Sequence, residues 1–243
     1  MHLPLDRGPL SRTVLLSLAE GTEIDDGLMV DAVQRTAAAA DVLADDDLQL
    51  MLWSLYELHF RGFDGVDPGR EWDPRLLRVR AATEQVFEAV LRQRTAPYVE
   101  AALASTDDVP KQIHHVVDAV PGPSLAHYLQ REASHEQLAE FMTQRSLYHL
   151  KESDPAAFVL PRLDGPVKAA LAELLYDEYG GGRPDRLHAT LFARALEGCG
   201  LDASYGAYVD LTPGYTLAVN NAMSLFGLNR RRVARGQVDV RPV

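Results

Sequence analysis

The sequence is poor in cysteine and in basic residues, and both shortages limit what it can build. Cys199 is the single thiol in 243 residues, which excludes an intramolecular disulfide framework and a cysteine-rich zinc site. Only 24 lysines and arginines stand against 35 acidic residues, giving a formal net charge of -11. This balance argues against a general affinity for nucleic acid or for an anionic membrane surface. We expect neither as a partner, and the lack of disulfides fits a reducing compartment.

Long apolar runs are missing as well. Near the N-terminus the longest apolar stretch is residues 14–16, which is too short for the core of a signal peptide, and no later stretch approaches membrane-spanning length. We therefore expect a cytoplasmic protein without a membrane segment. The hydrophobic content of 47% is enough for one large domain or two small ones with a real core.

Strict alternation of apolar and polar residues, which is typical of strands, is not sustained anywhere. Apolar residues instead recur at helical spacings of three and four, which predicts an all-α fold. Proline and short polar residues crowd between 110 and 123, where we expect the junction between a helical N-terminal region, 1–122, and a second domain. The segments with the helical pattern are 27–43, 47–60, 74–106, 123–153, 165–179, 185–198 and 213–228.

The stretch "LLYDEYGGGRPDRLHATLF", residues 174–192, interrupts this pattern with three glycines. Before the break, Glu178 continues the apolar stripe of its helix, so its carboxylate is expected to point inward. After the break, Pro184 suits the first turn of a new helix, and His188 shares a face with apolar residues. An inward carboxylate usually has a cationic partner or a metal ion. The pair on either side of the glycines therefore indicates a candidate metal site.

A further carboxylate with these properties is Glu152, which ends a helix just before Pro155. Arg145 and Tyr148 lie on the same helical face. The structural alternative is an internal contact between Arg145 and Glu152 about two turns apart. His149 and Glu152, three residues apart, form another pair with the spacing of metal ligands, although that pairing alone is weak evidence.

Several motifs in the second half of the chain resemble one known family, over about residues 125–229. They are similar to the bacterial iron-containing redox enzymes with a haem-oxygenase-like fold, the haem-oxygenase-like diiron oxidases and oxygenases. The motifs are "YHLKESDP" at 148–155, "VLPRL" at 159–163, "DEYGGGRPDRLH" at 177–188, "YGAYVD" at 205–210 and "AMSLFGL" at 222–228.

The resemblance implies a partial haem-oxygenase-like helical bundle over 123–229. It implies that Glu152, Glu178 and His188 are metal ligands, with Asp185 as an optional further ligand. Complete members hold two non-haem irons and use O2 as co-substrate, so the implied activity is oxidation of a small amine- or carboxylate-bearing metabolite by N-oxygenation, C–C cleavage or desaturation. A homodimer is expected.

After residue 229 the chain departs from the family. Members continue with a late helix that carries a histidine, an aspartate four residues on and a histidine three further, whereas here an arginine-rich tail, 230–243, follows and no histidine lies beyond His188. We expect a truncated or frame-shifted sequence that lacks half of the ligands, so enzymatic activity is uncertain. Two alternatives stay open: a non-catalytic helical remnant or interaction module, and a haem-binding or metal-free haem-oxygenase-like protein in which His127 or His135 is available as axial ligand.

Overall fold

Helices make up the regular secondary structure of the computed structural model, which describes residues 1–39, 41–120 and 122–230. No strand occurs in these ranges, so the predicted all-α class is confirmed. The helices are α1 (Pro9–Glu20), α2 (Asp26–Ala39), α3 (Asp46–Glu57), η1 (Pro68–Trp72), α4 (Pro74–Leu103), α5 (Val109–Ala119), α6 (Leu125–Arg131), α7 (His135–His149), α8 (Asp154–Ala157), η2 (Leu160–Arg162), α9 (Gly165–Glu178), η3 (Gly180–Gly182), η4 (Pro184–Arg186), α10 (His188–Gly198), η5 (Val209–Leu211) and α11 (Gly214–Leu228).

Two helix boundaries differ from the expected ones because capping side chains start new helices. The supposed junction contains α5, where Asp108 accepts a hydrogen bond from the amide of Lys111 and Pro110 occupies the first turn. The expected segment 123–153 is split into α6 and α7, because Ser134 and Gln137 form a capping box that starts α7. Helix α1 was also missed by the sequence pattern.

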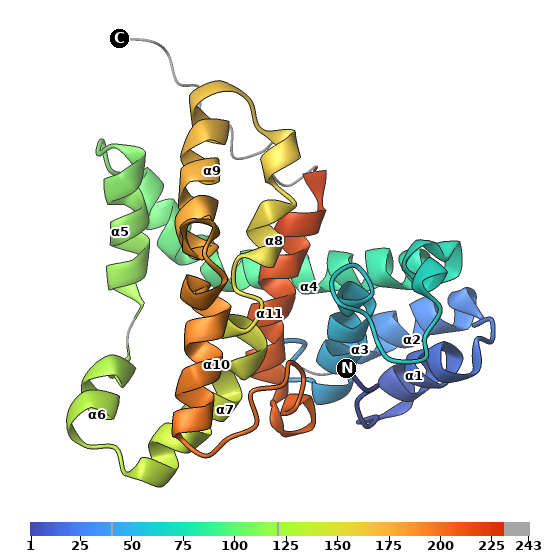
Figure 1. The fold of residues 1–243 in the computed structure, drawn as a ribbon. Helices are drawn as coiled ribbons and strands as arrows, with labels where there is room; N and C mark the ends of the chain where they lie inside the picture. The colour runs from blue at the N-terminus through green and yellow to red at the C-terminus, as the bar shows by residue number, and fades with distance from the viewer. Residues whose placement is uncertain (40, 121, 231–243) are drawn as a thin grey trace.

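Helix α3 is the centre of the hydrophobic core; Figure 1 shows it close to α1, α2 and α4. Each of its residues from Leu48 to Glu57 is buried, as expected of a helix surrounded on all sides. Helices α1, α4 and α11 pack around it, and Leu217 and Leu225 of α11 belong to the same core. This core joins residues on both sides of the predicted boundary at 122/123, and the division itself stays a prediction. The predicted tail, 230–243, lies outside the described residues except for residue 230.

Buried amides fix how α11 lies on α3. The Asn221 side-chain nitrogen donates to the side-chain oxygen of Gln49 at 2.8 Å and to its carbonyl at 2.9 Å. The Gln49 side-chain nitrogen in turn donates to the carbonyl of Val42 at 2.8 Å. Because an unpaired buried amide costs free energy, these bonds favour one register of α11 against α3.

A buried ion pair ties the end of α7 to α3. Lys151 Nζ lies 2.7 Å from Glu57 Oε2, and their side chains are 4% and 0% exposed. The phenol of Tyr205 donates to the same oxygen at 2.8 Å, and burial beside Glu57 raises the pKa of Tyr205 well above its usual value. The ammonium also lies 4.2 Å from the ring centre of Phe60. The residue before Glu152 is therefore held to the core.

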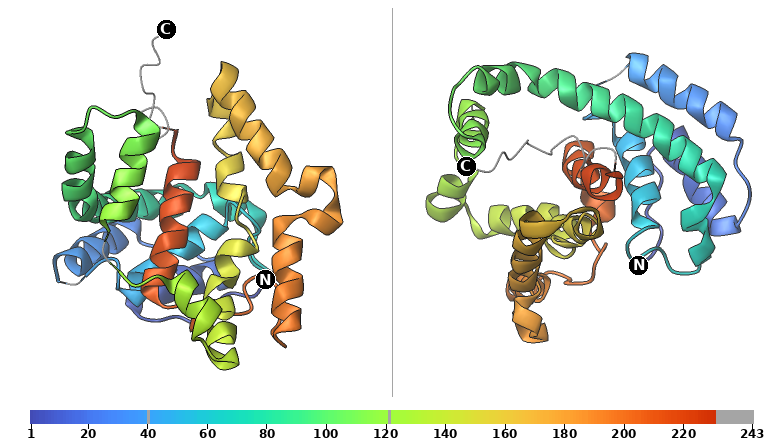
Figure 2. Two further views of the ribbon diagram at one scale, coloured as in Figure 1. Left: turned by 90° about the vertical axis from the view of Figure 1, so that its left-hand side faces the viewer. Right: turned by 90° about the horizontal axis from the view of Figure 1, so that it is seen from above.

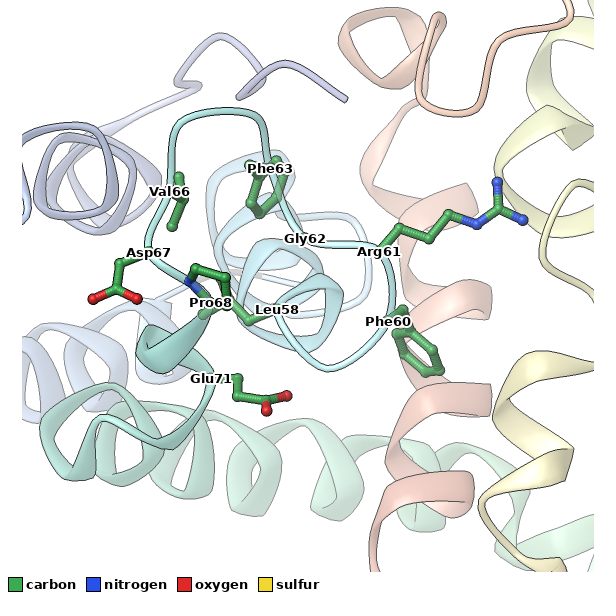
Figure 3. A pocket seen from close by; sticks show the side chains of 9 residues that line it. All are labelled: Leu58, Phe60, Arg61, Gly62, Phe63, Val66, Asp67, Pro68 and Glu71. Carbon is green, nitrogen blue, oxygen red and sulfur yellow. The ribbon is translucent and has the colours of Figure 1, made fainter.

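The loop after α3 supplies a second tie to the same place. It borders a cavity of about 230 Å³ that also contacts η1, but the Arg61 side chain extends away from the other labelled side chains (Figure 3). Its guanidinium donates to the carbonyl of Leu150 at 2.7 Å and lies 4.4 Å from the ring centre of Tyr205. Arg61 thus fixes the last turn of α7 instead of filling the cavity.

Helix α4 is the long connection from the N-terminal helices to α5 (Figure 2). At its far end, α5 leaves Ile113, Val117 and Val120 more than half exposed. A partner chain in the expected homodimer would bury such side chains. The homodimer itself stays a prediction. Within the described ranges, no helix combines the length and the apolar composition that crossing a bilayer requires.

Lys151→Met should destabilise the fold by about 3–5 kcal/mol, because it leaves the buried carboxylate of Glu57 without its counter-ion. Urea unfolding followed by circular dichroism measures the change. Arg12→Met is the matched control, since the ion pair of Arg12 with Asp6 is largely exposed and its loss should matter little. Equal stabilities of the two variants would contradict the role given to Lys151.

His59 provides a pH-dependent contribution to stability. Its side chain is 7% exposed, its ring packs edge-on against Trp72 at 5.4 Å, and burial together with the nearby Arg80 lowers its pKa from 6.5 to about 4. The folded protein therefore holds this imidazole neutral where the unfolded chain would protonate it.

The stability that neutral His59 contributes is complete above pH 6.5 and is lost as the pH falls towards 4. We expect the unfolding free energy to fall more steeply across this window in the unaltered protein than in His59→Gln, which carries no titrating ring. Urea unfolding at several pH values within the window tests this. Parallel pH profiles for the two proteins would show that His59 does not titrate as described.

Candidate metal centre

Three helix ends bring Glu152, Glu178 and His188 together. Glu152 lies in the turn between α7 and α8, Glu178 is the last residue of α9, and His188 is the first residue of α10. One ligand atom from each lies within 4.8 Å of the other two, and His188 Nδ1 is 2.8 Å from Glu178 Oε2. Among the described residues, this is the group of histidine, cysteine or acidic side chains with the spacing to hold a metal ion.

The three glycines produce this meeting of α9 and α10. Gly180, Gly181 and Gly182 all have positive φ, at 68°, 64° and 77°, a conformation that other residues rarely adopt. At Gly180 there is a second constraint, because a Cβ atom would come within 2.6 Å of the Arg186 carbonyl carbon and 2.7 Å of the Leu187 nitrogen. The chain therefore turns back on itself tightly enough to place the first residue of α10 beside the last residue of α9.

Helix α10 begins later than the sequence pattern predicted. Pro184 starts the short turn η4 instead of the helix itself, and α10 starts at His188 after Leu187. The imidazole therefore projects from the first position of a helix. At this position its side chain can contact Glu178 at the end of α9.

The expectation that both ligands point inward holds only in part. The Glu178 side chain is 22% exposed, whereas that of His188 is 48% exposed, so the inward orientation predicted for His188 is wrong. The apolar stripe that predicted it is itself uneven, since Leu175 is buried while Val167 and Leu174 are more than half exposed. Helix α9 packs mainly through Leu175, and helical spacing alone does not reveal which part of a stripe is covered.

Each carboxylate has a hydrogen-bond partner besides the trio. Ser153 Oγ donates to Glu178 Oε2 at 3.0 Å, and His149 Nδ1 lies 3.2 Å from Glu152 Oε2. Arg145 Nε donates to His149 Nε2 at 3.4 Å; since a guanidinium can only donate, Nε2 is the acceptor and Nδ1 carries the proton towards Glu152. The contact between Arg145 and Glu152 considered from the sequence is therefore replaced by a chain through His149.

Tyr148 approaches Glu152 from another direction. Burial, with a hydrogen bond to Glu152 and the negative charge of that residue, raises the pKa of Tyr148 to about 12. The phenol thus keeps its proton, and its ring packs edge-on against that of His149, with 4.7 Å between the ring centres. Groups that pack around a metal ligand and its hydrogen-bond partners help to set the orientation of that ligand.

Other candidate residues lie apart from the trio. Asp185, the optional ligand, is in η4 with its side chain 58% exposed, 3.9 Å from Arg183 Nε, and it is not in the group of possible ligands. His127 is 59% exposed and lies 4.0 Å from Glu132, and His135 is the exposed first residue of α7. The structure brings together three of the four predicted metal ligands.

Two features of the site escaped the sequence pattern. Ser153 gives no periodic signal, and only its adjacency to Glu152 could have drawn attention to it. The second feature is the ion pair of Lys151 with Glu57. The sequence does carry a signal for it, because Glu57 ends an otherwise mostly apolar, buried helix. A carboxylate in such a run requires a cation from elsewhere in the chain.

The donor set suits a divalent metal with a preference for oxygen and nitrogen. Two carboxylates and an imidazole are ligands that iron(II) and manganese accept. Gathering two partly buried carboxylates costs free energy through their mutual repulsion, and a divalent cation between them would turn this repulsion into attraction. The residues present therefore fit a metal ion.

Gly180→Ala should destabilise the fold more than the matched substitution Gly182→Ala. Either substitution forces an alanine into the left-handed backbone conformation, which costs about 1–2 kcal/mol. A Cβ added at Gly182 has no other atom within 4 Å. At Gly180 the clash with backbone should add about 1–3 kcal/mol. Chemical denaturation measures both; equal losses would show that the close approach does not constrain the turn.

Comparisons with known proteins agree with the motifs. Residues 139–238 match the family described as iron-containing redox enzyme. A stretch of 80 residues, 33% of this chain, is 32% identical to nitrosourea synthase from Streptomyces achromogenes subsp. streptozoticus. The matched stretch covers only 17% of that synthase. Residues 139–238 of this chain thus carry the sequence pattern of the iron-containing redox enzymes, which confirms the resemblance inferred from the motifs.

Proposed function

We propose that the chain binds iron through Glu152, Glu178 and His188 and uses it with O2 to oxidise a small amine- or carboxylate-bearing metabolite. The observation that carries the proposal is the convergence of three ligand atoms within 4.8 Å. The family match supports iron as the metal. The substrate type and the use of O2 come from the resemblance and from the chemistry of the ligands.

The protein's own residues would hold and orient the metal. Glu152 and Glu178 supply negative charge, and His188 supplies a neutral nitrogen ligand. His149 Nδ1 lies 3.2 Å from Glu152 Oε2 and Ser153 donates to Glu178, so each carboxylate has a hydrogen-bond partner of its own and keeps further lone pairs for a metal. When bound, iron supplies the electrons with which O2 is activated.

The similarity to nitrosourea synthase supports one branch of this chemistry. The name of that relative describes a product in which a nitrogen atom carries oxygen, which favours N-oxygenation among the three reaction types. Since the similarity covers 17% of the synthase, it supports a reaction type and does not identify a substrate.

The candidate ligands also bear on how many irons the chain would hold and on whether it would hold haem instead. The described residues provide one group of three ligands, which supports one iron per chain from these residues. His127 and His135, the candidate axial ligands for haem, are exposed and lie in or at the start of α6 and α7. We therefore favour non-haem iron, and we place the protein in the cytoplasm because its single cysteine suits a reducing compartment.

Glu178→Ala should weaken iron(II) binding more than about tenfold, because it removes a ligand where even indirect partners of a metal have effects of that size. Anaerobic titration with iron(II), followed by gel filtration and metal analysis, gives the affinity and the count per chain. Glu173→Ala, on the exposed side of the same helix, is the matched control. We expect one iron per chain, lost with Glu178 and kept with Glu173; equal uptake by both variants would remove Glu178 from the ligand set.

A further inference from the structure

A second cavity, of about 420 Å³, lies between α6, α7 and the first half of α11. Its size is within the range of small-molecule sites. Most of its wall is apolar or aromatic, and the side chains that form this part include Leu129, Phe141, Val219 and Tyr128. These helices meet near the lower end of the molecule in Figure 1. The cavity is therefore suited to an apolar ligand.

Arg145 is the only positively charged residue among those that line the cavity. Within the described part of the chain it forms no ion pair with a carboxylate; its contacts are the hydrogen bond from Nε to His149 and the ring of Tyr148, 4.7 Å from the guanidinium carbon. Its two terminal nitrogens have no hydrogen-bond acceptor there. A partly buried guanidinium with both terminal groups available is well suited to bind an anion in a bidentate manner.

Tyr148 connects this cavity to the candidate metal centre. Its side chain lines the cavity, and its ring packs edge-on against His149, whose Nδ1 lies 3.2 Å from Glu152 Oε2. Arg145 lies one helical turn before Tyr148 on the same face of α7, so the charged end of the cavity is the end nearest the metal ligands. A ligand bound through Arg145 would thus lie next to the proposed reaction centre.

The other charge in the wall lies further from the metal ligands. Glu140 is exposed and accepts a hydrogen bond from Gln144 at 2.7 Å. An ammonium group bound there would be in contact with solvent, whereas a carboxylate at Arg145 would be partly desolvated, which strengthens its electrostatic interaction. The arrangement of charges therefore favours carboxylates over amines as ligands of this cavity.

We propose that the cavity binds a small monocarboxylate with an apolar chain, its carboxylate on Arg145 and its chain along Leu129, Phe141 and Val219. As an assignment of the substrate, this rests on the function proposed above and selects the carboxylate among the two substrate types. As a binding site it does not require the metal, because none of these residues belongs to the trio.

Calorimetric titration of the iron-free protein with octanoate tests the proposal, with octylamine and octan-1-ol as probes of equal chain length. We expect octanoate to bind at least about tenfold more tightly than either, since a charge-assisted hydrogen bond contributes this much or more. Arg145→Gln should weaken octanoate binding by a similar factor, and Arg145→Lys should restore part of it. Arg131→Gln, a nearby arginine outside the cavity lining, should have no effect.

A second variant guards against a loss of folding in Arg145→Gln, which would be detected by thermal unfolding. Val219 is half exposed, so Val219→Asp should fold and should weaken octanoate binding by repulsion. Equal binding of octan-1-ol, tighter binding of octylamine, or no effect of either substitution would overturn the proposal. Iron titration of the same variants separates the two hypotheses: octanoate binding without iron uptake would refute only the proposed metal function, and iron uptake without octanoate binding would refute only the ligand site.

Discussion

Lys151 is buried against Glu57, and the position of the candidate metal centre depends on this pair. Removing two charges from water is costly, and the geometry compensates through a 2.7 Å contact and the phenol of Tyr205 on the same oxygen. Glu57 belongs to α3, whose residues from Leu48 to Glu57 are all buried. The ammonium of Lys151 must therefore reach Glu57 inside the core, which fixes the position of Lys151. The neighbouring Glu152 is consequently carried to a fixed point beside the core, and Arg61 strengthens this attachment through the carbonyl of Leu150.

Close backbone approaches bring the remaining parts to that point. Gly180 lets the chain fold back on Arg186 and Leu187, and Gly227 does the same between α11 and α8, where a Cβ would lie 2.4 Å from the Pro155 carbonyl oxygen. Arg162 then donates to the carbonyls of Gly227 and Leu228 at the end of α11. Three of the motifs that resemble the family thus contain close backbone approaches, and two of them also contribute the candidate ligands.

Helical spacing predicted the helical class, and the resemblance to the iron-containing redox enzymes implied the grouping of Glu152, Glu178 and His188; the glycines and prolines beside them are the local signal that marked the break between α9 and α10. The sequence pattern failed where the outcome depends on distant partners. The exposure of His188 could not be predicted, since helical periodicity identifies an apolar face but not the element that covers it. Lys151 went unnoticed because its partner lies in α3, and the cap at Asp108 was overlooked because the prolines that follow it were interpreted as a linker.

Two of the three candidate ligands, Glu152 and His188, lie at the ends of the stretch 152–188, and Glu178 lies within it, at the end of the largely exposed helix α9. A metal bound to all three would cross-link this stretch into a closed loop. The entropy that the chain loses on loop closure would reduce the observed free energy of metal binding. By thermodynamic linkage, the ordering of α9 and α10 and the occupancy of the site are then a single equilibrium. If the proposed site binds metal, its apparent affinity would accordingly measure how well that segment is already folded.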